Sequence, residues 1–287
     1  MMRFDSALGL SSRRGPLATS LKVLLYTAMV LVFTGPLVGL LASAFNRTLD
    51  PTKFTLWPDQ PTLENFVQAG NMNVYHYLFN SFVVVGFGLL LQMLVSVFAA
   101  YALARKKFRG MGVVMLIMLA TMMMPEEIIA IPLSLVLSDM PVLHVDLIGT
   151  YAGMILPLGA WGFSILVMTE FMKEVPIELE EAARIDGAGE LRIFATIILP
   201  LCRPALGVIG VFGFTMIWDQ YMLPLIVAPE PDMFTLPIAL RSLRSNEEVG
   251  IGVLLAASLL ALLPSIIAFL AFQRQFMRGL TSGAIKG

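Results

Sequence analysis

The sequence predicts an all-α, polytopic membrane protein with six transmembrane helices. Of its 287 residues, 57% are hydrophobic and only 14% are charged, and the mean hydropathy is +0.82. In soluble domains roughly a quarter of the residues are charged, so this chain lacks the polar surface that a water-soluble protein needs. A net charge of -1 argues against a nucleic-acid binder. The single cysteine, Cys202, excludes both a disulfide scaffold and a thiolate metal site.

Six apolar stretches meet or approach the roughly 20 residues that a helix needs to cross a bilayer core. The third stretch is the least regular, because Pro125, Glu126 and Glu127 interrupt it. It could end there and be followed by a short outer helix. The predicted spans are residues 23–45, 78–103, 111–137, 151–172, 205–227 and 250–272.

The first stretch also has features of a cleaved signal peptide. Arg13 and Arg14 precede it, and Ala42-Ser43-Ala44 has the small residues of a cleavage site. Its apolar length of about 23 residues exceeds the roughly 7–15 of a signal-peptide core. We therefore expect this stretch to remain as a span.

The placement of Lys and Arg predicts the topology, because basic residues collect on the cytoplasmic side. They are concentrated in the N-terminal segment, after the second and fourth spans, and at the C-terminus; the other side has Arg47, Lys53, Arg241 and Arg244. Both termini are therefore predicted to be cytoplasmic. The expected organisation is a cytoplasmic segment 1–22, a transmembrane domain 23–272 and a cytoplasmic tail 273–287, with outer loops 46–76 and 228–249 and an inner loop 173–203.

The sequence contains no motif for chemistry of its own. It has no GxxxxGK[ST] phosphate loop, HExxH, CxxC or GxSxG, so we expect no catalytic residue, metal or cofactor in this chain. A transporter built on it must take its energy from a nucleotide-hydrolysing partner or from an ion gradient. Ion-coupled carriers keep ionisable groups deep in the membrane. The candidates Glu126, Glu127 and Asp219 form no clear relay, which favours a partner.

The inner loop carries the most informative pattern, a short helix–turn–helix. Pro176 opens a helix where its missing N–H costs nothing, and Glu178, Glu180 and Glu181 complement the positive end of the helix dipole. Arg184 can pair with Glu180 or Glu181 on the same face. Asp186-Gly187 ends this helix, because glycine adopts the left-handed conformation. A second helix is predicted over about 189–198, before Pro200.

Two interpretations of this loop remain open on its residues alone. Small side chains at 182, 183 and 187–189 expose backbone and allow another protein to approach closely. Alternatively, the loop is an amphipathic segment that lies at the lipid headgroups.

The loop resembles the EAA loop of ABC importer permeases. Glu181-Ala182-Ala183, Gly187, Ile197 and Leu199-Pro200 occupy every specified position of that motif. The chain as a whole is similar to the carbohydrate-uptake permeases of the maltose (MalG-like) type from about residue 20 to its end. Supporting segments are residues 77–81, 124–132, 218–224 and 276–287.

The resemblance implies a role for each motif and a set of partners. The residues that would couple to a cytoplasmic ATPase subunit are Glu181, Ala182, Ala183, Arg184, Asp186 and Gly187. The tail residues that would lie near the interface of the ATPases are Gly279, Thr281, Gly283 and Lys286. The implied partners are a second permease, two ATP-binding subunits that hold ATP and Mg, and an extracytoplasmic sugar-binding protein, all at the bacterial inner membrane.

Candidate residues for a sugar pathway lie near the end of the fifth span. Trp218, Asp219, Gln220 and Tyr221 combine aromatic and hydrogen-bonding groups, as sugar sites do. Related permeases often have Trp-Asn-Glu-Phe here, so the chain departs from them at three positions. The alternative is an interfacial aromatic belt. Two further pairs of residues each have two interpretations. Asn80 and Ser81 either line the sugar path or hydrogen-bond a neighbouring helix. Glu126 and Glu127 either face an aqueous vestibule or cap an outer helix.

Together these features predict a permease subunit of an ATP-driven importer for a mono- or oligosaccharide, and not an enzyme. The alternative is a self-contained secondary transporter or channel driven by an ion gradient. In that case the inner loop would serve only as an interfacial anchor.

Overall fold

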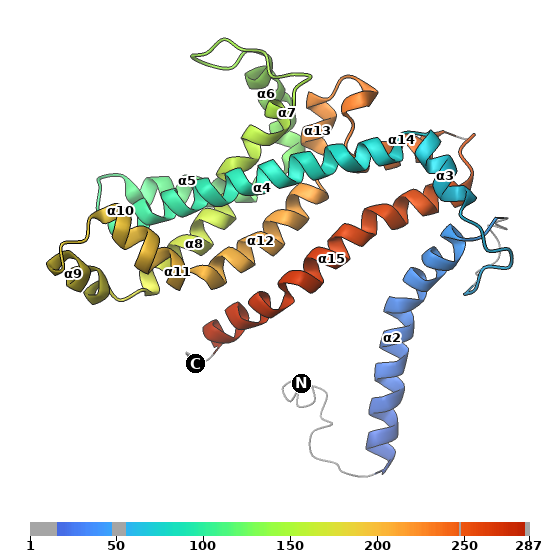
Figure 1. Ribbon diagram of the computed structural model, residues 1–287, viewed down its shortest axis with the longest axis horizontal. Helices are drawn as coiled ribbons and strands as arrows, with labels where there is room; N and C mark the ends of the chain where they lie inside the picture. The colour runs from blue at the N-terminus through green and yellow to red at the C-terminus, as the bar shows by residue number, and fades with distance from the viewer. Residues whose placement is uncertain (1–15, 48–55, 247, 285–287) are drawn as a thin grey trace. The chain divides into compact units, whose positions relative to one another are not determined.

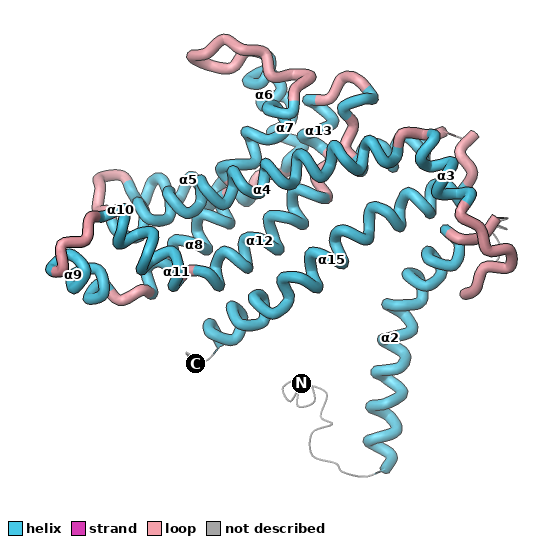
Figure 2. The backbone as a smooth tube through the Cα atoms, viewed as in Figure 1, coloured by secondary structure: helices cyan, strands magenta, loops and turns pink. Residues whose placement is uncertain are grey.

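The computed structural model describes residues 16–47, 56–246 and 248–284. Figure 2 shows that these residues are helical apart from their connections, as the sequence predicted. They form two compact units, one from residues 1–71 and 247–259 and the other from residues 72–246 and 260–287. Of the basic residues used to predict the topology, Arg3, Arg13, Arg14, Lys53 and Lys286 lie outside the described residues.

The first unit contains α2 (Pro16–Ala44), α3 (Glu64–Asn71) and the first turns of α15 (Ile251–Ala284). Asn65 is buried on α3 and donates from Nδ2 to the carbonyls of Ala44 at 3.0 Å and Asn46 at 2.9 Å. Gly252 of α15 approaches this amide so closely that a Cβ there would lie 2.7 Å from Asn65 Oδ1. The outer loop predicted at 46–76 therefore contains a helix that is hydrogen-bonded to the end of α2 and lies close against the start of α15.

The second unit is built around α4 (Val74–Arg105), a continuous helix of 32 residues. In Figure 1, α8 and α12 lie alongside it, and α14 lies near its N-terminal end. Small residues allow η1 (Leu156–Ala160) to approach α4 closely, as is typical of membrane helices. A Cβ on Gly88 would lie 3.0 Å from Leu158 Cδ1, and one on Gly159 would lie 3.0 Å from Leu91 Cδ2. Besides α4 and the part of α15 from Leu260 onward, the described helices of this unit are α5 (Met111–Met123), α6 (Glu126–Ser138), α7 (Tyr151–Ile155), η1 (Leu156–Ala160), α8 (Gly162–Glu174), α9 (Ile177–Ile185), α10 (Glu190–Ile193), η2 (Phe194–Ile198), α11 (Leu199–Leu201), α12 (Arg203–Trp218), α13 (Met222–Val227), η3 (Pro231–Met233) and α14 (Leu236–Ser245).

Three helices in the described residues are each long and apolar enough to cross a membrane, and three bent pairs raise the number to six if each pair is one span. The bends are 111° between α5 and α6, 40° between η1 and α8, and 70° between α11 and α12. The interruption predicted at Pro125 is confirmed. The spans predicted at 151–172 and 205–227 are not single continuous helices: the first is interrupted at Trp161 and the second at residues 219–221.

Two further segments differ from the prediction. The outer loop 228–249 contains α14, an amphipathic helix that buries Leu236, Ile238, Ala239 and Leu243. Arg241 and Arg244, two of the basic residues predicted for this loop, are exposed on the same helix. The tail begins as part of α15, which continues to Ala284 and includes Gly279, Thr281 and Gly283.

Candidate functional site

The inner loop forms the helix–turn–helix that the sequence predicted. Pro176 caps α9 at its N-terminal end, and α9 ends in a glycine turn. Gly187 has φ +80°, its N–H donates to the Arg184 carbonyl at 3.0 Å, and the N–H of Ala188 donates to the Ala183 carbonyl at 2.9 Å. These two bonds are those of a Schellman motif, which requires a left-handed residue at this position. The turn therefore depends on glycine.

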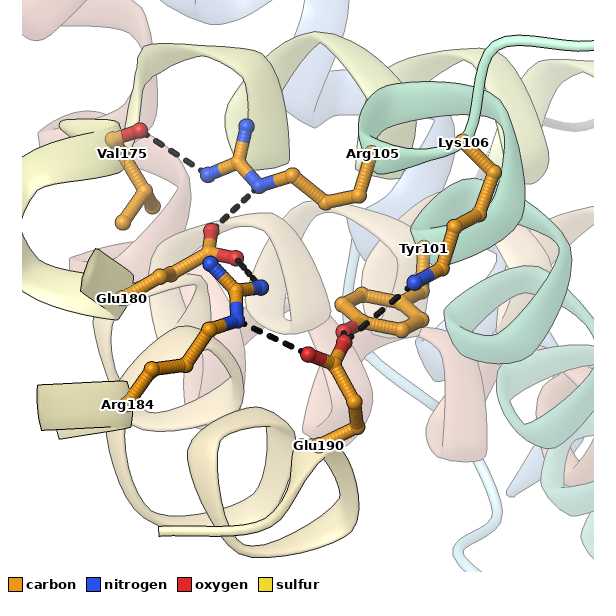
Figure 3. A network of polar contacts seen from close by, with 7 residues as sticks. All are labelled: Tyr101, Arg105, Lys106, Val175, Glu180, Arg184 and Glu190. Carbon is orange, nitrogen blue, oxygen red and sulfur yellow. Dashed lines mark hydrogen bonds and ion pairs between the residues drawn. The ribbon is translucent and has the colours of Figure 1, made fainter. Parts of the chain in front are cut away.

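A buried ion pair fastens α9 to the end of α4 (Figure 3). Arg105 Nε and Glu180 Oε1 lie 2.5 Å apart, and their side chains are only 9% and 0% exposed. Arg105 also donates from Nη2 to the Val175 carbonyl at 2.9 Å, which fixes the residue just before α9. On the other side of the carboxylate, Arg184 Nη2 donates to Glu180 Oε2 at 3.3 Å. The pairing predicted between Glu180 and Arg184 is thus confirmed, but its buried partner Arg105 was not foreseen.

Glu190, the first residue of α10, closes the network. Its Oε1 accepts from Arg184 Nε at 2.8 Å, and its Oε2 accepts from Tyr101 OH at 2.9 Å and from Lys106 Nζ at 3.3 Å. These hydrogen bonds, that from Arg184 foremost, lower the pKa of Glu190 from 4.5 to about 2. The same contact raises the pKa of Arg184. Figure 3 shows both helices of the loop tied to α4 through these groups.

The side of the loop away from α4 is open and partly apolar. Glu181 and Ala182 are exposed, and so are two large aliphatic side chains, Ile185 at 86% and Leu191 at 79%. A Cβ on Gly187 would meet no atom within 4 Å. The loop therefore presents small and aliphatic groups on a surface whose opposite side is held rigidly.

The second helix of the loop is longer than predicted. It runs from Glu190 through Pro200 to Leu201 instead of ending before the proline. A proline ring clashes with the carbonyl four residues before it, here that of Thr196. The segment Phe194–Ile198 is a π-helix, whose wider hydrogen-bonding pattern accommodates the proline. The prediction failed because it treated proline as a stop signal.

The structure separates the four residues predicted for a sugar pathway. Trp218 is buried, donates from Nε1 to the Ala261 carbonyl at 3.0 Å, and stacks on Phe214 with ring centroids 5.6 Å apart. It is thus a packing residue of α12. Asp219 ends that helix, and Tyr221 lies under the guanidinium of Arg241 at 5.3 Å. Of the four residues, Gln220 lines a cavity.

Asn80 and Ser81 hold the outer loop, which supports the packing interpretation for them. Asn80 is fully buried; its Nδ2 donates to the carbonyls of Asp232 at 2.8 Å and Phe234 at 3.0 Å, and its Oδ1 accepts from Tyr151 OH at 2.7 Å. Ser81 Oγ accepts from the Leu236 N–H at 2.8 Å. His76 Nε2 adds a bond to the Asp232 carbonyl at 2.7 Å. The first two turns of α4 therefore fix residues 232–236.

A cavity of about 280 Å³ lies in the second unit. Its polar lining comes from Thr121, Glu126 and Gln220, and its one indole from Trp161. The vestibule interpretation of Glu126 is supported by this position, whereas Glu127 is not among the lining residues. Trp161 is not among the residues predicted from the sequence. The feature that could have indicated it is a large aromatic side chain between two small residues, Ala160 and Gly162, within an apolar stretch. The described residues contain no group of three His, Cys, Asp or Glu side chains that could hold a metal ion.

Comparisons with known proteins identify relatives along most of the chain. Residues 92–281 match the family described as "Binding-protein-dependent transport system inner membrane component". The arabinooligosaccharides transport system permease protein AraQ of Halalkalibacterium halodurans is 33% identical over 91% of this chain and 94% of its own length. The diacetylchitobiose uptake system permease protein DasC of Streptomyces coelicolor is 35% identical over 91% and 95%. A chain from the crystal structure of a bacterial ABC transporter involved in the import of alginate has the same fold, with a TM-score of 0.79 at 20% identity over 92% of this chain and 98% of that one.

Proposed function

Because the chain belongs to the binding-protein-dependent inner membrane components, the permeases of ABC importers, we propose that it forms, with a second permease, the membrane path of a sugar. The relatives named above transport arabinooligosaccharides and diacetylchitobiose, which supports a mono- or oligosaccharide as substrate. Family membership accounts for the EAA motif, so the ion-gradient alternative has no support.

The inner loop is the observation that carries this proposal. A loop that transmits force must be rigid where it joins its own subunit and accessible where it meets its partner. The buried Arg105–Glu180 pair provides the first property, and the exposed Ala182, Ile185 and Leu191 provide the second. We propose that this face sits in a cleft of an ATP-binding subunit. Ile185 and Leu191 would be buried in that cleft, which would explain why such large aliphatic side chains are exposed when the chain is considered without its partners.

The proposed assembly contains two permeases, two ATP-binding subunits that hold ATP and Mg, and an extracytoplasmic binding protein. Six spans with both termini in the cytoplasm would agree with the positions of the basic residues. By length and composition, the described residues offer between three and six spans. The tail residues Gly279, Thr281 and Gly283 would then lie on the ATPase side of the membrane, as would Lys286. Closure of the ATP-binding subunits would displace the inner loop and move the spans between inward- and outward-facing states.

Purification of the tagged chain in mild detergent from its native host, followed by mass spectrometry, tests the proposal. We expect recovery of a second permease and an ATP-binding subunit. Glu181→Lys and Gly187→Pro should remove the ATP-binding subunit while the second permease remains bound. Glu170→Lys, at an exposed position on α8, is the matched charge-reversal control and should retain both. Recovery of the chain alone, or with copies of itself, would contradict the proposal.

A further inference from the structure

The cavity in the second unit lies where three helical interruptions meet. Its lining includes Met124 and Glu126 from the break between α5 and α6, Trp161 from the break between η1 and α8, and Gln220 and Met222 from the break between α12 and α13. Irregular backbone at membrane depth is tolerated only where protein buries it or where it lines a water-accessible space. Three breaks around one cavity therefore indicate that this part of the chain is shaped to line a hydrated path.

The chemistry of the lining is that of a site for a hydroxylated ring. Most of the wall is apolar, with soft methionines that adapt to shape. No hydrogen bond to another side chain or backbone group in the described residues occupies the amide of Gln220 or the carboxylate of Glu126, so both are available to a ligand. A planar amide and a carboxylate can each bond neighbouring hydroxyls. An indole such as that of Trp161, which also contacts Phe163 with ring centroids 4.8 Å apart, can stack on the C–H side of a sugar ring.

The size and charge of the cavity narrow the ligand further. Its volume of about 280 Å³ lies at the lower end of the roughly 300–1,000 Å³ of small-molecule sites, which suits one sugar ring at a time and not a folded oligosaccharide. The lining has a carboxylate but neither lysine nor arginine. A uronic acid would bring a second negative charge beside Glu126 with no cation to balance it.

We propose that this cavity is a subsite for a single neutral pyranose ring, in which Trp161 stacks on the ring while Gln220 and Glu126 bond its hydroxyls. This inference rests on the proposed sugar transport. It assigns the sugar contacts to Trp161, Gln220 and Glu126 in place of Trp218 and Tyr221. Glu126 is the specificity-determining residue, because its charge excludes acidic sugars.

Cysteine protection in the assembled importer tests the subsite. In a Cys202→Ser background, Gln220→Cys introduces one thiol, which is modified by a charged methanethiosulfonate reagent in membrane vesicles. The neutral probes are melibiose and diacetylchitobiose, which consist of pyranose rings, and the acidic probe is digalacturonate. We expect the transported neutral sugar to slow modification at 220 and digalacturonate to leave it unchanged. Leu225→Cys, on α13 but outside the lining, is the control and should react at the same rate with every sugar.

Transport measurements separate the subsite from the function on which it rests. Gln220→Ala should raise the KM for the neutral sugar about 2- to 10-fold, the factor for one lost hydrogen bond, with the ATP-binding subunit still bound. Glu126→Gln should increase transport of the acidic sugar relative to the neutral one. An importer that assembles and transports, yet shows no protection at 220 and an unchanged KM in Gln220→Ala, would overturn the subsite and leave the proposed function intact. Failure to recover any ATP-binding subunit would instead refute the proposed function.

Discussion

Replacing Glu180 by glutamine should release the inner loop from the rest of the chain. The substitution keeps the volume of the side chain but removes the charge that pairs with buried Arg105 at 2.5 Å. Arg105 would retain its bond to the Val175 carbonyl, yet its own charge would stay buried with no anion beside it. A buried charge without a counterion is costly, and moving α9 away would allow water to reach the guanidinium.

The expected magnitude follows from the burial of the two side chains. Breaking a buried ion pair by removing one partner costs about 3–5 kcal/mol, and the contact to the partly exposed Arg184 adds about 0.2–1 kcal/mol. Glutamine still accepts a hydrogen bond, so we take the lower end, about 3 kcal/mol. Because about 1.4 kcal/mol corresponds to a tenfold change in an equilibrium constant, the open population of the loop should rise roughly 10²-fold.

Hydrogen exchange of the purified protein in lipid nanodiscs measures that population. Amides of residues 177–186 should exchange roughly 10²-fold faster in Glu180→Gln, while those in the middle of α4 stay unchanged. Glu170→Gln is the matched control: it breaks an exposed ion pair with Lys173 at 2.8 Å, which is worth at most about 1 kcal/mol. The double variant Arg105→Met/Glu180→Leu should exchange more slowly than Glu180→Gln, because neither charge is left alone. Equal exchange in Glu180→Gln and Glu170→Gln would refute the reasoning.

Three further predictions concern the glycine turn, the outer loop and the Glu190 network. Gly187→Ala places a Cβ on a residue with φ +80°, so it should destabilise the turn by about 1–2 kcal/mol and reduce transport. Gly189→Ala, at φ -74°, is the control and should leave transport unchanged. Equal transport by the two variants would contradict the prediction that the turn requires glycine at 187. Asn80→Leu leaves the Phe234 carbonyl and the Tyr151 hydroxyl without their Asn80 partner, at up to about 3 kcal/mol for each of these partly buried groups, while the Asp232 carbonyl keeps its bond from His76. Limited proteolysis should then cut the outer loop faster than in Tyr151→Phe, which removes one bond. The pKa of Glu190 is about 2, below its ordinary 4.5, so the stabilisation that its hydrogen bonds give the inner loop is complete above about pH 4.5 and is lost as the pH falls toward 2. Hydrogen exchange of the amides of residues 184–193 should therefore be equal at pH 5 and pH 7 after correction for intrinsic rates. A large rise in exchange at pH 5 would show that these hydrogen bonds do not hold the carboxylate.

The inner loop could be predicted closely because its signals are local. Pro176, the acidic first turn and Gly187 each act on the backbone within a few residues, so their spacing determined where α9 begins and ends. The partner of Glu180 could not be predicted in the same way. Arg105 lies 75 positions earlier in the chain, and only the packing of α4 against the loop brings the two together. Local sequence patterns carry no information about such pairs.

The pathway residues were harder to predict for a different reason. A hydropathy pattern records whether a stretch is apolar, and it remains apolar across the breaks at Trp161 and at residues 219–221. Trp218 and Gln220 are two positions apart, yet one is buried against Ala261 and the other lines the cavity. The helix ends between them, so the 3.6-residue period that relates neighbouring side chains no longer applies. Only Pro125 marked its break in the sequence, because proline affects the backbone directly.

The two polar anchors of the second unit lie at opposite ends of one unbroken helix. Tyr101 and Arg105 join the inner loop to one end of α4, and Asn80 and Ser81 join the outer loop to the other. At 1.5 Å per residue, the 32 residues of α4 span about 48 Å without a proline. A continuous helix resists bending, so a displacement of the inner loop that moves α4 also moves the outer loop.

The cavity, in contrast, is lined by the interrupted helices and takes no residue from α4. A ligand shifts a conformational equilibrium only through different affinities for the two states. A sugar bound among Glu126, Trp161 and Gln220 contacts three breaks whose angles can change while α4 stays straight. In the proposed function, this architecture would separate the two tasks of an importer subunit: the continuous helix would relate the inner loop to the outer loop, and the bent helices would make the affinity for the sugar depend on the conformational state.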